Sequence, residues 1–407
     1  MSKPIRVGFI GLSSHENIHL AGSWGKKGHL PYLAHSPDYT ITALCNSSLE
    51  SAKKAAELHG LDVSKVRTYG DPESLANDDN VDLVVCSVNV MQHYRLIKPA
   101  LVAGKMVFCE WPLASNLSQM KELADLAEQK KLKTIVGLQG RTGAYVHAVR
   151  KFIGSAAGQL GEVLSTSMMV YSLFGGLVLP KEIAYLADIK SGGSIFTITA
   201  IHSECLSVPP QNNLQRHGRK LTALSPSVLD TLTAALGEIE THNILLRNKR
   251  PTFALTDNDF NIIGSSVPNS TPDHVLVHGT LTGNIPFNFQ VRGGPQFKDT
   301  PAFDWRIYCT RGEIRVSGNE MLWTGGAIKV QVHDFVTNKV EDVDLGQVLE
   351  ENVKDDIAYK LGLKAPADNV GRLYEAFAKG KTEKYLDFAQ SLKWARFIQE
   401  AYTANGM

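Results

Sequence analysis

Short apolar segments alternate with amphipathic ones along the first third of the chain. Five continuously apolar runs are predicted to be strands, at residues 5–10, 41–45, 81–88, 106–109 and 134–138. The stretches between them have the pattern of helices, at residues 48–59, 71–76, 92–103 and 117–130. Apolar strands separated by helices indicate a parallel sheet covered on both faces. The right-handed crossover rule then predicts a doubly wound α/β domain of the Rossmann type over residues 1–141.

The pattern changes after residue 141. A helix is predicted over residues 144–155, and strands follow at 161–172, 242–246, 274–282, 286–291, 305–310, 313–317 and 327–332. Alternating positions with turns between them predict an α+β domain over residues 142–407, with a large, open, mostly antiparallel sheet. Three C-terminal helices, at 353–361, 369–379 and 385–403, are expected to return to the first domain.

Composition narrows the function classes. The 42 Lys and Arg residues nearly balance the 41 Asp and Glu residues, and the net charge of +1 excludes an electrostatically driven nucleic-acid binder. No window approaches about 18 uninterrupted apolar residues, so we expect no membrane span. The chain runs straight into a strand, so we also expect no signal peptide. The five cysteines lack a C-x-x-C pair, which predicts reduced thiols in the cytoplasm or nucleus and no metal site.

The end of the first strand is the candidate phosphate site. Gly8 lies within the strand, and Gly11, Ser13 and Ser14 form the turn that follows it. A helix after such a turn offers free N–H groups to a pyrophosphate. The full fingerprint needs three glycines, and Ser13 and Glu16 stand where the second and third would fall. Either the turn no longer holds a cofactor, or it is rebuilt so that the two serine hydroxyls donate.

The end of the second strand is the candidate ribose site. An acidic residue normally stands there in NAD-binding proteins, and this chain has Asn46 followed by Ser47 and Ser48. Asn46 can hydrogen-bond a ribose, but it carries no charge that would repel a 2′-phosphate. NAD and NADP are therefore both open. The alternative role for Asn46 or Ser48 is to cap the helix that follows.

Three further motifs resemble one oxidoreductase family. They are Val88-Asn89 with His93 after the strand at 81–88, then A-L-V-A-G-K at 100–105, then Glu110-Trp111-Pro. This spacing is similar to that of the glucose–fructose oxidoreductase and inositol dehydrogenase (GFO/IDH/MocA) family. The resemblance implies that Val88, Asn89, His93 and Glu110 lie at the cofactor. The family lysine that polarises the reacting oxygen is Trp111 here.

Within that family, the chain is most similar to the branch of the fungal galactose/lactose regulatory repressors, which are non-catalytic. The shared features are the Glu-Trp pair, G-L-Q-G-R at 137–141, T-P-D-H at 271–274 and the glycine-flanked segment at 312–318. The resemblance adds Gln139 and Arg141 to the expected cofactor residues, and it implies an activator protein as a partner if the chain is regulatory. The charged insert that we associate with this branch is absent.

The family's catalytic segment, G-G-G-x-x-x-D-x-x-x-H-x-x-D, matches residues 192–202. His202 stands on the family histidine, and Ile198 stands on the aspartate. A neutral imidazole at His202 can serve as an acid or base; the alternative is a histidine that only packs in the core. Trp111 can pack or offer a stacking surface. Candidate donors nearby are Tyr94, Tyr145, Tyr171 and Tyr185.

Residues 204–228 interrupt this pattern. Removing them would place Asp230 at the H-x-x-D spacing after His202. The segment is polar and aperiodic, and it is either a translated, unspliced intron or a loop beside the pocket.

Two classes of function follow. One is an enzyme acting on a small molecule in the interdomain cleft, either an NAD(P)-dependent oxidoreductase with a rebuilt acid site or a lyase, dehydratase or cyclase. The other is a cofactor-binding co-regulator of transcription, which would be nuclear. The family resemblance implies a homodimer through the exposed face of the sheet.

Overall fold

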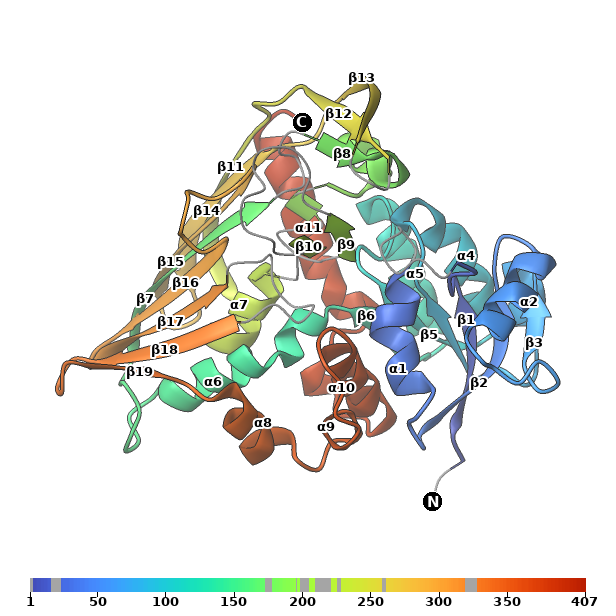
Figure 1. Ribbon diagram of the computed structural model, residues 1–407, viewed down its shortest axis with the longest axis horizontal. Helices are drawn as coiled ribbons and strands as arrows, with labels where there is room; N and C mark the ends of the chain where they lie inside the picture. The colour runs from blue at the N-terminus through green and yellow to red at the C-terminus, as the bar shows by residue number, and fades with distance from the viewer. Residues whose placement is uncertain are drawn as a thin grey trace. The chain divides into compact units, whose positions relative to one another are not determined.

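The computed structural model describes residues 3–15, 23–172, 178–194, 196–197, 205–208, 221–224, 228–257, 261–318 and 328–407. The chain divides into two compact units (Figure 1). Unit 1 comprises Met1–Gln139, Lys190–Gly193 and Asp355–Gln399. Unit 2 comprises Gly140–Ile189, Ser194–Lys354 and Glu400–Met407.

A parallel sheet forms the centre of unit 1. Its described strands are β1 (Ile5–Ile10), β2 (Tyr39–Cys45), β3 (Arg67–Tyr69), β4 (Leu83–Cys86), β5 (Met106–Glu110) and β6 (Thr134–Gly137). They pair in the order β3-β2-β1-β4-β5-β6, and every pairing is parallel. The strand order reverses beside β1, as in dinucleotide-binding folds. The predicted doubly wound domain is confirmed.

Helices connect these strands, and four of them begin at polar caps. They are α2 (Leu49–Leu58), α3 (Pro72–Ala76), α4 (Val90–Val102) and α5 (Leu117–Gln129). The side chains of Ser48, Asp71, Asn89 and Asn116 each accept a hydrogen bond from a backbone N–H in the first turn. The other helical segments of unit 1 are η1 (Gly25–His29), α1 (Leu30–Leu33), η4 (Ile189–Ser191), α9 (Ile357–Lys360), α10 (Ala367–Ala378), η6 (Thr382–Lys384) and most of α11 (Phe388–Ala404).

A large sheet dominates unit 2. In the described residues its order is β11-β14-β15-β7-β16-β17-β18-β19. The strands are β7 (Val163–Ser172), β11 (Ile239–Arg247), β14 (His274–Leu281), β15 (Ile285–Gly293), β16 (Phe303–Cys309), β17 (Gly312–Gly318), β18 (Ile328–Asp334) and β19 (Lys339–Asp342). All pairs are antiparallel except β7 with β15. Buried and accessible positions alternate along most strands, as predicted for an open sheet.

Smaller elements complete unit 2. The helices are η2 (Gln139–Thr142, at the boundary with unit 1), α6 (Ala144–Phe152), η3 (Lys181–Ala187), α7 (Val228–Leu236) and α8 (Leu345–Val353). A second sheet has the order β8-β12-β13, from Val178–Pro180, Thr252–Thr256 and Ile262–Pro268. Within residues 204–228, the described residues form two antiparallel strands, β9 (Cys205–Val208) and β10 (Leu221–Leu224).

One predicted helix is misplaced. We expected a helix at 353–361, but α8 ends at Val353 and the short α9 follows separately. Helix α8 begins early because Oδ1 of Asp344 accepts hydrogen bonds from the N–H groups of Gly346 (2.8 Å) and Gln347 (3.2 Å). The two helices are separated at Asp356, whose backbone is extended (φ −69°, ψ 141°). In the described residues, no helix is both long and apolar enough to span a membrane.

Candidate functional site

A cavity of about 540 Å³ lies in unit 1 at the carboxyl ends of β1, β2 and β4. In doubly wound folds this edge is where ligands bind. Six of the predicted cofactor residues line it, namely Gly11, Ser13, Ser14, Asn46, Ser47 and Val88. Residues that the sequence analysis did not select also line it, among them Ser51, Asp71, Glu73, Gln92 and Arg95.

The turn after β1 is built around Gly11. This residue has a φ of +93°, and its N–H donates to the carbonyl of Cys45 (3.0 Å). A Cβ atom at this position would lie 2.5 Å from the Ser87 carbonyl oxygen and would overlap the side chain of Val88. Only glycine permits both the conformation and this close approach of the turn to the end of β4. The result is a wall of bare backbone, which suits a pyrophosphate.

The carbonyl of Ser13 is fixed by a histidine. Nε2 of His59 donates to it over 2.7 Å. Burial lowers the pKa of His59, opposed by this hydrogen bond, so the imidazole is neutral at neutral pH. The hydroxyl of Ser14 lies 3.3 Å from the hydroxyl of Ser51, which is part of α2. Residues 16–22 lie outside the described residues, and the next described helical segment after this turn is η1.

Asn46 stands at the end of β2 with its amide in a defined orientation. Its Nδ2 donates to the carbonyl oxygens of Leu12 (2.9 Å) and Ser51 (3.2 Å). Its Oδ1 is buried, and no described residue donates to it. A backbone cradle at Gly11 and an acceptor that lacks a donor at Asn46 fit the pyrophosphate and the ribose of a dinucleotide. Asn46 does not cap α2, because Ser48 does so through its hydroxyl.

Glu110 lies inside unit 1 and does not line the cavity. Its carboxylate is fully buried and accepts a hydrogen bond from Nε2 of His29 (2.8 Å). Nδ1 of His29 lies 2.7 Å from the hydroxyl of Tyr374. The two ring nitrogens of His29 thus join the Glu110 carboxylate to the Tyr374 hydroxyl. Burial raises the pKa of Tyr374 well above its usual range, so the hydroxyl keeps its proton.

Gly8 and Asn89 also lie outside the cavity lining. Gly8 is in β1, where a Cβ atom would meet Leu75 and Val81 at 3.0 Å. Asn89 is the N-cap of α4, and its Oδ1 accepts from the N–H of Met91 (2.9 Å). Both residues therefore have structural roles next to the site.

His93 joins two loops at the edge of the sheet. Its Nδ1 lies 2.7 Å from the carbonyl oxygen of Pro112, and its Nε2 lies 3.0 Å from that of Val88. His93 thereby positions Val88, which lines the cavity, and the residue after Trp111.

His93 belongs to a group of histidine and cysteine side chains, which are residue types that can bind a metal ion. The atoms of His93, Cys86 and Cys109 lie within 4.8 Å of one another. The two ring nitrogens of His93 face carbonyl oxygens, which favours donation over coordination. Burial, together with a hydrogen bond to Cys86, raises the pKa of Cys109 well above its usual range, so this thiol stays protonated. In the described residues, this group is buried, and both ring nitrogens of His93 already face carbonyl oxygens.

Gln139 and Arg141 flank the boundary between the units. Gln139 is buried at the end of unit 1. Arg141 belongs to unit 2 and makes a two-pronged ion pair with Asp230 of α7, with both N···O distances at 2.9 Å. Asp230 is fully buried, and the Arg141 side chain is only 9% exposed. Arg141 therefore neutralises a buried carboxylate, a role that the sequence alone did not indicate.

The predicted catalytic residues are only partly described. Trp111 is in unit 1, directly after β5, and is 1% exposed. Tyr185 is in η3 of unit 2, and its carbonyl oxygen accepts from the N–H of Asp188 (3.1 Å). His202 and Ile198 lie outside the described residues.

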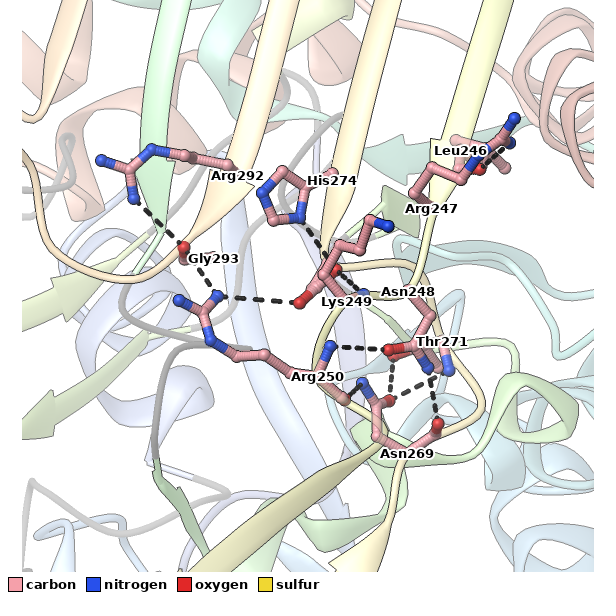
Figure 2. Close-up of polar contacts among 11 residues, drawn as sticks. Leu246, Arg247, Asn248, Lys249, Arg250, Asn269, Thr271, His274, Arg292 and Gly293 are labelled. Atoms are coloured by element: carbon pink, nitrogen blue, oxygen red, sulfur yellow. Dashed lines mark hydrogen bonds and ion pairs between the residues drawn. The ribbon is translucent and has the colours of Figure 1, made fainter.

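The T-P-D-H run forms a separate polar cluster in unit 2 (Figure 2). Asp273 is fully buried, and its Oδ1 accepts from the N–H of Lys249 (2.7 Å) and from Nδ1 of His274 (2.9 Å). Nη1 of Arg250 lies 3.6 Å from Oδ2 of Asp273 and donates to the carbonyl of Gly293 (2.9 Å). This run therefore fixes the loop before β12 against the ends of β14 and β15.

These features define the class of the protein. A parallel sheet in this strand order, with a glycine turn at the carboxyl end of β1, is the architecture of dinucleotide-binding oxidoreductases.

Sequence comparison assigns the chain to the same class of protein. Residues 5–138 match the oxidoreductase family with an NAD-binding Rossmann fold, and residues 215–318 match the C-terminal domain of Gal80p. The chain belongs to the glucose–fructose oxidoreductase and inositol dehydrogenase family.

Relatives that match most of the chain include a dehydrogenase and a regulatory protein. Dehydrogenase aclE of Aspergillus oryzae is 30% identical over 384 residues, which are 93% of this chain and 94% of that protein. The galactose/lactose metabolism regulatory protein GAL80 of Saccharomyces cerevisiae is 28% identical over 326 residues, which are 78% of this chain and 67% of that protein.

Solved structures show the same fold. A super-repressor mutant of Gal80p from Saccharomyces cerevisiae has a TM-score of 0.78 at 24% identity, covering 99% of this chain and 96% of that chain. Levoglucosan dehydrogenase in complex with NADH and L-sorbose has a TM-score of 0.71 at 16% identity, covering 99% of this chain and 98% of that chain. At these identities the likeness concerns the fold alone.

The Gly11 turn yields a stability prediction. Gly11→Ala introduces a side chain in the left-handed region and forces it against Ser87 and Val88. We expect it to lower the free energy of unfolding by about 1–3 kcal/mol more than Gly104→Ala does. Gly104 is the matched control, because it also has positive φ but nothing lies within 4 Å of a Cβ atom there. Urea denaturation of both variants measures the difference, and equal losses would contradict the close approach.

Proposed function

We propose that the chain binds NAD or NADP in the cavity at the carboxyl edge of the parallel sheet and acts as an oxidoreductase on a small organic molecule. The observation that carries this proposal is the pairing of the Gly11 backbone cradle with the buried Asn46 acceptor in one cavity. The similarity to a dehydrogenase over 93% of the chain supports it.

The residues of the chain take separate roles in this proposal. The turn from Gly11 to Ser14 binds the pyrophosphate, and Asn46 binds the adenosine ribose. The bound nicotinamide supplies the hydride chemistry, and the protein supplies orientation and proton transfer. Trp111 replaces a lysine, so it offers a flat apolar face and one N–H donor but no cation. His202 is the proposed acid–base group, and Tyr185 is a further donor.

Two alternative functions rest on the replaced residues. With Trp111 and Ile198 in place of lysine and aspartate, the same scaffold can serve a lyase, dehydratase or cyclase that uses His202 alone for acid–base work. It can also serve a non-catalytic co-regulator that binds an activator protein. The similarity to GAL80, a regulatory protein, and the match of residues 215–318 to the Gal80p C-terminal domain favour the second alternative.

Nucleotide binding is the first test. We expect calorimetric titration of the purified protein to show binding of at least one of NAD⁺, NADH, NADP⁺ and NADPH, with micromolar or tighter affinity. The absence of heat and of a thermal shift with all four would refute the proposal. If binding is found, a panel of polyols and aldoses is the next test: cofactor reduction supports the oxidoreductase, and binding without cofactor reduction supports the two alternatives, the non-redox enzyme and the co-regulator.

Trp111 allows a test of the chemistry. We expect Trp111→Lys alone to give no robust sugar dehydrogenase activity, because Ile198 still denies the site its second polar partner. The paired variant Trp111→Lys with Ile198→Asp serves as the comparison, and we expect any gain to need both changes. Cofactor reduction with simple sugars is the measurement. Strong activity of the single variant would contradict this view.

We also propose that a second copy of the chain covers the open face of the large sheet. Accessible apolar side chains gather on this face: Leu245 is 42% exposed, Leu276 37%, Met169 38% and Tyr308 45%. Leu245 pairs with Leu276 across β11 and β14, and both point to the same face as Met169. An apolar group of this kind, set among polar residues, is typical of an interaction surface.

Light scattering after gel filtration tests the dimer. We expect a mass of twice the chain for the wild type and of one chain for Leu276→Lys, because a lysine would be buried in the interface without a partner. Ile262→Lys is the control, since Ile262 is 66% exposed but lies in β13, which belongs to the separate three-stranded sheet. A monomeric wild type would overturn the proposal.

A further inference from the structure

Basic side chains gather at one end of the large sheet of unit 2 (Figure 2). Arg247, His274 and Arg292 are direct cross-strand partners on β11, β14 and β15. Such partners lie side by side on the same face of a sheet. Lys249 and Arg250 follow in the loop between the end of β11 and the start of β12. These five residues are called the basic cluster below.

The charge of the basic cluster is balanced only in part. Asp273 lies 3.6 Å from Nη1 of Arg250 and 2.9 Å from Nδ1 of His274, measured to its carboxylate oxygens. Among the described residues, no carboxylate forms an ion pair with the other three members of the cluster. Like charges directly opposite each other on neighbouring strands destabilise a sheet. A bound anion would relieve this repulsion.

Two guanidinium groups of the cluster converge on one backbone oxygen (Figure 2). Nη1 of Arg250 donates to the carbonyl of Gly293 over 2.9 Å, and Nη1 of Arg292 donates to the same oxygen over 3.3 Å. The next residue, Gly294, has a φ of +100°. A Cβ atom there would lie 3.0 Å from Nη2 of Arg250 and 3.5 Å from Nη1 of Arg292. Glycine at this position therefore keeps side-chain atoms away from both guanidinium groups.

The side chain of Arg292 is held in one orientation. Its Nη2 donates to the carbonyl of Pro295 (3.0 Å), and its guanidinium carbon lies 4.4 Å from the centre of the Tyr171 ring. Tyr171 is the cross-strand partner of Arg292 on β7. Because the guanidinium is already ordered, it loses little conformational entropy when it binds an anion. Its Nε has no acceptor among the described residues and can donate to a ligand.

We infer that the basic cluster is a binding site for a phosphate group, with Arg250 and Arg292 as its principal donors. A phosphate monoester carries a charge of roughly −1.5 to −2 at pH 7 and three strong acceptor oxygens. It therefore matches two guanidinium groups and the cations around them better than a single carboxylate does. The phosphate is either free or carried by a small metabolite. The cluster belongs to unit 2, so this inference does not depend on nucleotide binding in unit 1.

Titration with inorganic phosphate tests the inference. Phosphate is exchanged for chloride at constant ionic strength, so that screening stays the same, and calorimetry measures the affinity. We expect the wild type to bind phosphate saturably and Arg292→Gln to weaken this binding by about tenfold or more, because a charge-assisted hydrogen bond is lost. A wild type that binds no phosphate overturns the inference, and so does an Arg292→Gln variant that binds it as the wild type does.

Two control variants locate the phosphate. Arg311→Gln removes an exposed arginine of unit 2 whose Nη2 donates to the carbonyl of Gln159, outside the cluster. Arg95→Gln removes the arginine that lines the cavity of unit 1. We expect both variants to keep the phosphate that Arg292→Gln loses. An equal loss in Arg311→Gln would show a general effect of charge, and a loss in Arg95→Gln alone would place the phosphate in unit 1; either result overturns the inference.

A second variant is available in case Arg292→Gln does not fold. Arg247 is exposed, and Arg247→Gln leaves the contacts of Gly293 intact. We expect it to weaken phosphate binding by about three- to tenfold, because one of the surrounding cations is lost. Unchanged affinity in this variant would count against the cluster as the site.

A phosphate monoester distinguishes the two sources of the phosphate group. Glycerol 1-phosphate is titrated beside inorganic phosphate, with glycerol as the uncharged control. Tighter binding of the ester supports a phosphorylated metabolite as the ligand, and equal or weaker binding supports free phosphate. Binding of glycerol with the same affinity as its phosphate ester would show that the phosphate group is not recognised and would overturn the inference.

Discussion

The buried carboxylate of Glu110 is the interaction on which unit 1 depends. A buried carboxylate is costly unless it is hydrogen-bonded, and its partner, His29, comes from the helix after the first turn. His29 in turn needs Tyr374, which is on α10 near the end of the chain. The carboxylate also lies so close to Gly137 that a Cβ atom there would overlap it. This one group therefore links β5, β6, the first helix and a C-terminal helix, and it fixes the position of Trp111, the next residue.

The cavity beside this core is made mainly by backbone geometry. Gly11 brings the turn after β1 against the end of β4, and Asn46 ties β2 to the same turn through the carbonyl of Leu12. Serines at positions 13 and 14 are compatible with this turn, because Gly11 alone makes the close approach to the end of β4. One glycine is therefore enough for the shape of the turn, although counting glycines in the sequence suggested a degenerate site.

The sequence predicted those parts of the fold and of the candidate site that depend on the local pattern of apolar and polar residues. The apolar strands of unit 1 were found within a few residues, and so were Gly11 and Asn46, because a strand end is a local feature. Strand β3, only three residues long and without a fully buried side chain, was missed, and with it Asp71 and Glu73 in the cavity wall. The inward direction of Glu110 and the pairing of Arg141 with Asp230 depend on partners far away in the sequence. No local pattern reveals such partners.

The two halves of the proposed chemistry are physically separable. The cavity at the carboxyl edge of the parallel sheet belongs to unit 1. The groups that we propose to hold the nucleotide are the backbone of the Gly11 turn, the serine hydroxyls and the amide of Asn46, none of which transfers a proton near neutral pH. Trp111 adds only an N–H donor that does not ionise in this range. A chain of this family can therefore lose its lysine and aspartate and keep its cofactor. Nucleotide binding alone thus fits both a dehydrogenase and a regulator. The chemical difference between them lies in a residue that can exchange a proton with a substrate, which is the role that we propose for His202.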